Sequence, residues 1–274
     1  MPDGYSTLHP AMHGMVNIGV RAARRAGEIM VRHLNRLESL EVIEKGRNEF
    51  VSAVDRLAEE AVIEVIRDHY PEHAILGEES GASGDHEYQW IIDPLDGTTN
   101  YLHGFPVYAV SIAVAQAGTL KHGVVYDPLR QEIFTASRGQ GAQLDGRRIR
   151  VSKQISLRGA LLATGFPYRI TASRTDTYLD MLRAVLIETA GVRRLGSAAL
   201  DLCYVAAGRV DGFWELGLQK WDIAAGTLII REAGGRISDF NGTDAFIESG
   251  DLVAGTPKVY AALSKLLAPY ARGL

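Results

Sequence analysis

Cysteine is nearly absent from this chain of 274 residues, in which Cys203 is the only one. A single cysteine excludes an internal disulfide. Because its neighbours Leu202, Tyr204 and Val205 are apolar or aromatic, we expect Cys203 to be a buried structural thiol and not a nucleophile. Such low cysteine usage is compatible with a cytoplasmic protein, which is the location we expect.

Long apolar runs are also missing. No run reaches the roughly 18 residues that a membrane-spanning helix needs. Residues 1–13 are polar and lack the apolar core of a signal peptide. We therefore expect neither membrane insertion nor secretion, and we expect residues 1–13 to be a disordered extension.

The chain also lacks an excess of positive charge. The formal net charge is −4, so the chain lacks the cationic footprint that binding to a phosphate backbone needs. We expect no direct contact with nucleic acid. The hydrophobic fraction of 46% and the charged fraction of 23% are those of an ordinary globular protein.

Several well-known motifs are absent too. The chain has no Gly-Lys dipeptide, which excludes a P-loop, and the segment from Gly139 to Leu144 lacks the third glycine of a dinucleotide fingerprint. Phosphatases of the haloacid dehalogenase type need one residue between two aspartates, whereas two separate Asp93 from Asp96. All eight histidines lie at or before His122, and we expect no histidine-rich zinc site.

The hydrophobic pattern alternates between the periods of helices and strands. Antiparallel signals come early and β-α alternation comes late, which favours a layered α+β or α/β architecture. We expect a single unit over residues 14–274, with an α+β half at 14–155 and an α/β half at 156–274. The pattern predicts helices at 15–37, 55–70, 176–188, 197–207, 221–233 and 258–267, and strands at 74–77, 89–92, 107–117, 120–126, 133–137, 161–164, 210–216 and 252–255.

Two aspartates follow the apolar strand that ends at Ile92. Asp93 comes directly after it, and Asp96 precedes Gly97 and Thr98 in what resembles a helix start. Pro94 and Gly97 should hold a tight loop that cannot continue the strand. Free backbone N–H groups at a helix start favour a phosphate anion. The alternative is that Asp96 only caps a helix and Asp93 only makes a turn.

Other acidic residues weaken that alternative. Glu78 and Glu79 also follow an apolar strand, while Asp55 and Asp222 each open a helix. Functional side chains are commonly found at the ends of elements. Hard carboxylate oxygens suit Mg²⁺, which keeps several waters and bridges to substrate phosphate.

These segments together resemble the signature of the inositol monophosphatase family. The resemblance rests on Glu78-Glu79, on the run from Asp93 to Thr98 and on the run from Trp221 to Gly226, and it extends from about Met15 to the end of the chain. It implies the layered α-β-α-β-α sandwich that this family shares with the fructose-1,6-bisphosphatases. It also implies a homodimer, about two to three Mg²⁺ ions in the active site and inhibition by Li⁺.

The resemblance implies a role for individual residues. Glu78, Asp93, the Leu95 carbonyl, Asp96 and Asp222 would bind the metals. The catalytic residues would be Asp55, Glu78 and Thr98, with Asp55 and Thr98 orienting and deprotonating the attacking water. The substrate would contact Asp96, Gly97, Thr98, Gly196, Ser197, Ala198, Glu215 and Asp222.

The expected reaction is Mg²⁺-dependent hydrolysis of a small phosphate monoester by a metal-activated water, with myo-inositol 1-phosphate as substrate. The same chemistry on fructose-1,6-bisphosphate, 3′-phosphoadenosine-5′-phosphate or histidinol phosphate remains an alternative. Residues 194–201 and 208–212 look especially like bacterial members, one of which also serves in ribosomal RNA antitermination. A second hypothesis is therefore an accessory factor that binds the transcription machinery.

Overall fold

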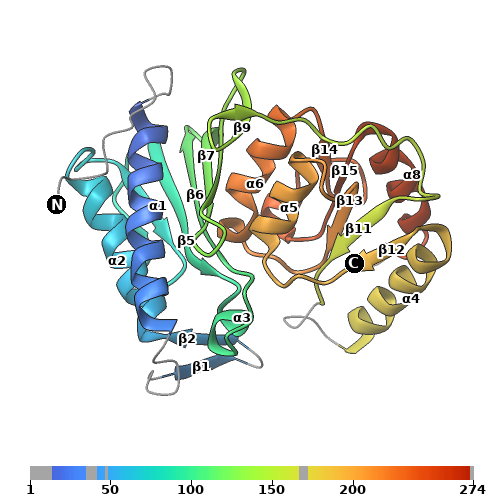
Figure 1. Cartoon of the computed structure of the whole chain (residues 1–274), viewed down its shortest axis with the longest axis horizontal. Coiled ribbons are helices and arrows are strands. Elements are labelled where there is room, and N and C mark those ends of the chain that lie inside the picture. The colour runs from blue at the N-terminus through green and yellow to red at the C-terminus, as the bar shows by residue number, and fades with distance from the viewer. Residues whose placement is uncertain (1–13, 35–41, 47–48, 167–171, 272–274) are drawn as a thin grey trace.

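In the described part of the chain, an eight-stranded and a five-stranded β-sheet alternate with three layers of helices, and a separate two-stranded sheet is also present (Figure 1). The computed structural model describes residues 14–34, 42–46, 49–166 and 172–271. Residues 1–13, which we expected to be a disordered extension, lie outside that part.

The large sheet has helices on both faces. Helices α1 (Gly14–His33) and α2 (Ala53–Arg67) cover its outer face. Helices α5 (Ala198–Ala206) and α6 (Lys220–Glu232) lie between it and the smaller sheet.

The smaller sheet is covered on its far side by α4 (Ala172–Glu188) and α8 (Pro257–Leu267) (Figure 1). Each helix layer presents an apolar stripe to a sheet, which is how amphipathic helices bury their hydrophobic face. The resulting order is α-β-α-β-α, so the expected fold class is confirmed.

The large sheet has eight strands in the order β10-β9-β8-β7-β6-β5-β3-β4. From β5 to β10 consecutive strands pair antiparallel, while β3 runs parallel to β5. The antiparallel pairing expected early in the chain is therefore present. The strands of the large sheet are β3 (Ala74–Gly77), β4 (Gly81–Ser83), β5 (Tyr88–Asp96), β6 (Ala109–Gln116), β7 (Thr119–Asp127), β8 (Glu132–Ser137), β9 (Gly141–Leu144) and β10 (Arg147–Arg148).

The smaller sheet has five strands in the order β12-β11-β13-β15-β14. Strand β11 runs parallel to both of its neighbours, and β15 runs antiparallel to both of its own. Its strands are β11 (Leu161–Thr164), β12 (Gly191–Arg193), β13 (Gly212–Glu215), β14 (Arg236–Ser238) and β15 (Leu252–Gly255).

The remaining elements lie outside these two sheets. They are the paired strands β1 (Val42–Gly46) and β2 (Glu49–Ser52) and the short helices α3 (Thr98–Leu102) and α7 (Phe246–Ser249).

One prediction about the central strand was wrong. We expected the strand to stop before Pro94, but β5 continues to Asp96. Its pairing with β6 shifts register between Asp93 and Asp96, so Pro94 lies in a bulge. A proline is tolerated there because the bulge removes the need for its missing N–H in the ladder.

Most other predicted elements are present with shifted ends. The first helix ends at His33, and residues 35–37 of that prediction lie outside the described residues. The second helix begins at Ala53, because Ser52 caps it, and ends at Arg67. Strands β1, β2, β4, β9, β10, β12 and β14 were not predicted; β4, β10, β12 and β14 have only two or three residues, which are too few to show a periodic pattern.

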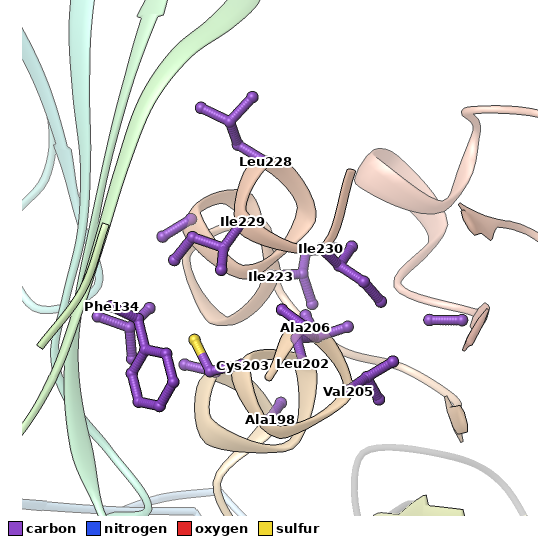
Figure 2. Close-up of a cluster of buried hydrophobic side chains, with 14 of the residues drawn as sticks. Phe134, Ala198, Leu202, Cys203, Val205, Ala206, Ile223, Leu228, Ile229 and Ile230 are labelled. Atoms are coloured by element: carbon purple, nitrogen blue, oxygen red, sulfur yellow. The ribbon is translucent and has the colours of Figure 1, made fainter. Parts of the chain in front are cut away.

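Helices α5 and α6 form the middle layer with a dense apolar core between the two sheets (Figure 2). Leu202 and Ala206 of α5 lie against Ile223 and Ile230 of α6. Cys203 faces the large sheet beside Phe134 and is fully buried, and burial raises the pKa of its thiol well above the usual value. A structural thiol is therefore confirmed.

Among the helices of the described residues, none combines the length and the apolar composition needed to cross a membrane.

Gly123 of β7 lies close against the backbone of α6. A Cβ added there would lie 2.8 Å from the backbone oxygen of Ala225. We expect Gly123→Ala to lower the free energy of unfolding by about 1–3 kcal/mol, because the helix has to move off the sheet. Urea denaturation measures the change. Gly14→Ala is the control, since its Cβ would meet only the Tyr70 hydroxyl at 3.6 Å; equal stability of the two variants would contradict the prediction.

Candidate active site

The first turn of α2 presents a buried carboxylate. Asp55 accepts hydrogen bonds at Oδ2 from the Ser52 backbone N–H (2.8 Å) and hydroxyl (2.6 Å). This capping arrangement fixes its position at the helix start. The other oxygen, Oδ1, lies 2.9 Å from the Thr98 hydroxyl, which is also 3.0 Å from the Leu95 carbonyl oxygen. Burial raises the pKa of Asp55, and its hydrogen bonds to Ser52 and Thr98 oppose that shift.

The bulge of β5 carries the two aspartates of the loop. Asp93 is almost fully buried and accepts a hydrogen bond at Oδ1 from the Leu95 N–H at 3.0 Å. Asp96 accepts two hydrogen bonds at Oδ2, one from the Ser197 hydroxyl at 2.6 Å and one from the Ala199 N–H at 2.7 Å. The bulge therefore joins the large sheet to the start of α5.

Two further acids approach from neighbouring elements. Asp222 lies in the first turn of α6, where the Gln219 N–H donates to its Oδ2 at 2.8 Å. Glu78 follows β3, and its N–H donates to the Ile92 carbonyl of β5 at 3.1 Å. Both carboxylates are thus brought to the end of β5 by backbone geometry.

The electrostatics show that these carboxylates share one site. Burial is the largest cause that raises the pKa of Asp93 well above its usual range, followed by the charges of Glu78, Asp96 and Asp222. Burial and then Asp222 raise the pKa of Asp96 to about 7, against the hydrogen bonds from Ser197 and Ala199. No cationic side chain is among the causes of either shift.

This donor set fits a divalent cation. Within the described part of the chain, no three His, Cys, Asp or Glu side chains are already arranged as a metal site. Like charges that are buried together repel one another. Carboxylate and carbonyl oxygens are the ligands that Mg²⁺ takes, and its charge would relieve the repulsion between Glu78, Asp93, Asp96 and Asp222.

The loop after β5 is held by a glycine and an asparagine. Gly97 has φ of 100°, and a Cβ there would lie 3.0 Å from the Val107 carbonyl oxygen and 3.1 Å from that of Gly196. Only glycine adopts this backbone without strain. The Asn100 side-chain amide donates to the carbonyl oxygens of Val107 and Leu195, each at 2.8 Å. Thr98 is therefore presented by a rigid turn.

The other predicted substrate residues lie at the start of α5 and at the end of β13. Gly196, Ser197 and Ala198 lead into α5, and the Ser197 hydroxyl donates to Asp96 in the bulge of β5. Glu215 ends β13, is 7% exposed, and lies so close to Gly165 that a Cβ there would be 1.9 Å from Oε1.

Three residues with a part in this arrangement were missed. Glu59 of α2 accepts hydrogen bonds from the N–H groups of Glu79 (2.9 Å) and Ser80 (2.7 Å), which fixes the turn after Glu78. Asn100 and the buried acid Asp201 are the other two. The signal for Glu59 was its position on the apolar face of a helix. Asn100 lies two residues after the recognised run from Asp93 to Thr98.

Comparison with known proteins shows the family to which the chain belongs. Residues 11–272 match the inositol monophosphatase family, so the chain belongs to that family. It is 53% identical to the Nus factor SuhB of Pseudomonas aeruginosa over 264 residues, which cover 94% of this chain and 97% of the relative.

Two solved structures show the same fold. The extragenic suppressor protein suhB of Bartonella henselae superposes with a TM-score of 0.91 at 43% identity, covering 96% of this chain and 100% of that one. An inositol monophosphatase from Anabaena superposes with a TM-score of 0.82 at 40% identity, covering 93% and 95%.

The raised pKa of Asp96 predicts a pH effect in metal-free protein. Between the ordinary value of 3.8 and about 7, the folded state binds more protons than the unfolded state. Stability in EDTA should therefore fall as pH rises through this range. We expect Asp96→Asn to remove part of that fall and to be more stable than wild type at pH 8 by roughly 2 kcal/mol. Urea unfolding at several pH values measures it, and parallel profiles for both proteins would refute the assignment.

Proposed function

We propose that this protein hydrolyses a small phosphate monoester in a Mg²⁺-dependent reaction and that its substrate is myo-inositol 1-phosphate. The observation that carries the proposal is the convergence of buried, mutually repelling carboxylates beside the Asp55–Thr98 hydrogen bond. Membership of the inositol monophosphatase family supports it.

In this proposal Glu78, Asp93, the Leu95 carbonyl, Asp96 and Asp222 hold about two to three Mg²⁺ ions. Bound Mg²⁺ supplies positive charge, which acidifies a water molecule and offsets the charge of the phosphate.

The chain's own residues then orient the reactants. The Thr98 hydroxyl has one hydrogen, and donating it to Asp55 Oδ1 leaves the oxygen lone pairs to accept a hydrogen bond from the attacking water. Asp55 is the proton acceptor of that relay, because its buried carboxyl has a raised pKa. Glu78 is the third catalytic residue, and the backbone N–H groups of Gly97 and Thr98 receive the phosphate.

In this proposal the substrate's hydroxyl groups contact the residues at the start of α5 and at the end of β13. These are Gly196, Ser197, Ala198 and Glu215, while Asp96 and Asp222 lie towards the phosphate. A carboxylate such as Glu215 accepts hydrogen bonds from a polyol. The structural relative from Anabaena is described as an inositol monophosphatase, which favours inositol phosphate over the fructose, nucleotide and histidinol phosphates.

Removing one charge from the site tests the metal assignment. We expect Asp93→Asn and Asp222→Asn to reduce phosphate release at least about a thousandfold, because each loses a charged ligand. Asparagine can still accept the hydrogen bonds from Leu95 and Gln219, so the fold should remain. Phosphate release measures activity, and circular dichroism measures the fold. Near wild-type turnover by either variant would contradict its assignment as a metal ligand.

The substrate is identified by measuring the hydrolysis of several phosphate monoesters in the presence of Mg²⁺. It compares myo-inositol 1-phosphate, fructose-1,6-bisphosphate, 3′-phosphoadenosine-5′-phosphate and histidinol phosphate. We expect the first to have the highest kcat/KM and its hydrolysis to be inhibited by Li⁺. Resistance to Li⁺ would count against the proposed metal site.

A second function is favoured by the relatives that are named Nus factors. We propose that the protein also binds the transcription machinery, which would place it in the cytoplasm. We also propose that the protein forms a homodimer. Its interface would cover the apolar surface that α4 exposes at Leu179, Leu186 and Ile187. The exposed Arg24 and Arg25 of α1 offer positive charge to a partner.

Capture from lysate tests the transcription role separately from catalysis. We expect Asp222→Asn, inactive as a phosphatase, to retain RNA polymerase or Nus-type factors as well as wild type does. Reversing charge at Arg24 and Arg25 should weaken capture, whereas reversing Lys265 on α8 is the control. Failure of wild type to retain any of these factors would remove the support for this role.

A further inference from the structure

A pocket of about 250 Å³ lies on the large sheet, at the opposite end of β5 from its bulge. Its walls come from the start of β5, the end of β6, the start of β7 and the end of β8, which are neighbouring strands (Figure 1). The pocket and the candidate active site are thus roughly 15 Å apart along β5. The lining includes Gln116, Lys121, His122, Ser137, Arg138 and Gln140.

The charge of this pocket is positive. Lys121 is half-buried and Arg138 is exposed, and none of the described residues that line the pocket is acidic. Among the ion pairs of the described chain, neither of these two cations takes part in one. Two cations in one pocket repel each other, and an anion between them offsets that repulsion. The pocket therefore suits an anion, although the chain as a whole has a net charge of −4.

Two acids beside the lining are engaged with other groups. Glu87 is exposed and accepts a hydrogen bond from Gln116 Nε2 at 3.1 Å. Glu232 of α6 accepts hydrogen bonds from the N–H groups of Gly139 at 2.8 Å and Gly141 at 2.7 Å. Glu232 thus holds the turn after β8, which forms the rim of the pocket, and neither acid is paired with a cation of the pocket.

A bulge in β7 explains how two consecutive residues line the same pocket. His122 pairs with Val114 and Leu120 pairs with Ala115, which leaves Lys121 as an extra residue without a partner on β6. Successive side chains of a regular strand point to opposite faces of the sheet. A bulge changes the direction of a side chain, and bulges are common beside functional sites. Here the bulge lets both Lys121 and His122 line the pocket.

Hydrogen bonds hold the lining in place. His122 and Ser137 are each only 8% exposed, and His122 Nδ1 lies 2.9 Å from the Ser137 hydroxyl oxygen. The Arg138 N–H donates to the Lys121 carbonyl oxygen at 2.9 Å, and the Gln140 N–H donates to that of Ser137 at 2.9 Å. A site whose donors are already fixed loses less conformational entropy when it binds a ligand.

The donors favour one class of anion. A guanidinium offers paired N–H groups and an ammonium offers a compact charge, and both are common ligands of phosphate oxygens. The Ser137 hydroxyl adds a further donor when His122 carries its proton on Nδ1 and donates it to Ser137 Oγ, because the hydroxyl hydrogen is then available. Pockets for drug-sized ligands have volumes of about 300–1,000 Å³, so this smaller pocket fits a small anion or one group of a larger molecule.

We propose that this pocket binds a phosphate group, with Lys121 and Arg138 offsetting its charge and Ser137 donating a hydrogen bond to it. The inference goes beyond the proposed function and does not depend on it, since binding at this pocket needs neither Mg²⁺ nor turnover.

The test is calorimetric titration of the whole protein with inorganic phosphate in EDTA at constant ionic strength. Without divalent cations, the carboxylates of the candidate active site repel phosphate. We expect wild type to show saturable binding. Lys121→Gln and Arg138→Gln should each raise Kd about tenfold, because each removes a charge-assisted hydrogen bond.

Lys265→Gln is the matched control. Lys265 is exposed on α8, beyond the smaller sheet, and this substitution changes the net charge as much as Lys121→Gln does. We expect it to have the wild-type Kd. An equal rise in Kd for Lys265→Gln would mean general attraction between charges and would overturn the site, as would an unchanged Kd for Lys121→Gln or binding by wild type that does not saturate.

NMR of the wild-type protein gives a readout that does not depend on whether a variant folds. During the same titration we expect the backbone amide signals of Lys121, His122 and Gln140 to shift, while those of Gly97 and Thr98 stay in place. Shifts confined to Gly97 and Thr98 would assign the bound phosphate to the loop after β5 and would rule out the pocket.

Inorganic phosphate and a phosphorylated molecule share this chemistry, so a second titration uses myo-inositol 1-phosphate, also in EDTA. Tighter binding of inorganic phosphate with shifts at the pocket supports a site for the free ion. Tighter binding of the monoester with the same shifts supports a site for a phosphorylated molecule. Absence of binding by both overturns the proposal, whatever the enzymatic activity with Mg²⁺ is.

Discussion

Repulsion between buried carboxylates is the constraint on which the rest of this structure depends. Asp93 and Asp96 lie on β5, while Glu78 and Asp222 come from elements on either side. Each like charge disfavours the ionised state of the others, so separate elements have to be packed firmly to keep them together. The apolar sheet and the helices around it supply that packing energy, and a cation is the chemical group that the arrangement can accept.

The middle layer of helices, α5 and α6, brings side chains to the bulge of β5. The starts of α5 and α6 both meet the bulge of β5: Ser197 and Ala199 hold Asp96, and the first turn of α6 carries Asp222. The same α5 packs against β13 of the smaller sheet, which ends at Glu215. A single pair of packed helices therefore links the carboxylates at the bulge of β5 to the smaller sheet.

Much of the layered fold could be predicted, and so could the residues of the candidate site, because their signals are local. Apolar strands that end in acids, such as the one before Asp93, are visible in the order of the residues. The bulge at Pro94 was missed, since local rules for proline end a strand there. Glu59 was missed because its partners, the N–H groups after Glu78, are about twenty residues away in the chain and meet it only after folding.

The amino-acid sequence by itself determined which chemical groups are present and where each lies in its element: acids at the ends of apolar runs, a glycine at residue 97 and one buried cysteine. Only the tertiary structure decided which acids meet and which charge they carry. Asp55 has its pKa raised by burial, and Asp201 has no hydrogen-bond partner within the described chain. Neither fact can be read from neighbours in sequence, because desolvation and charge interactions depend on distances in space.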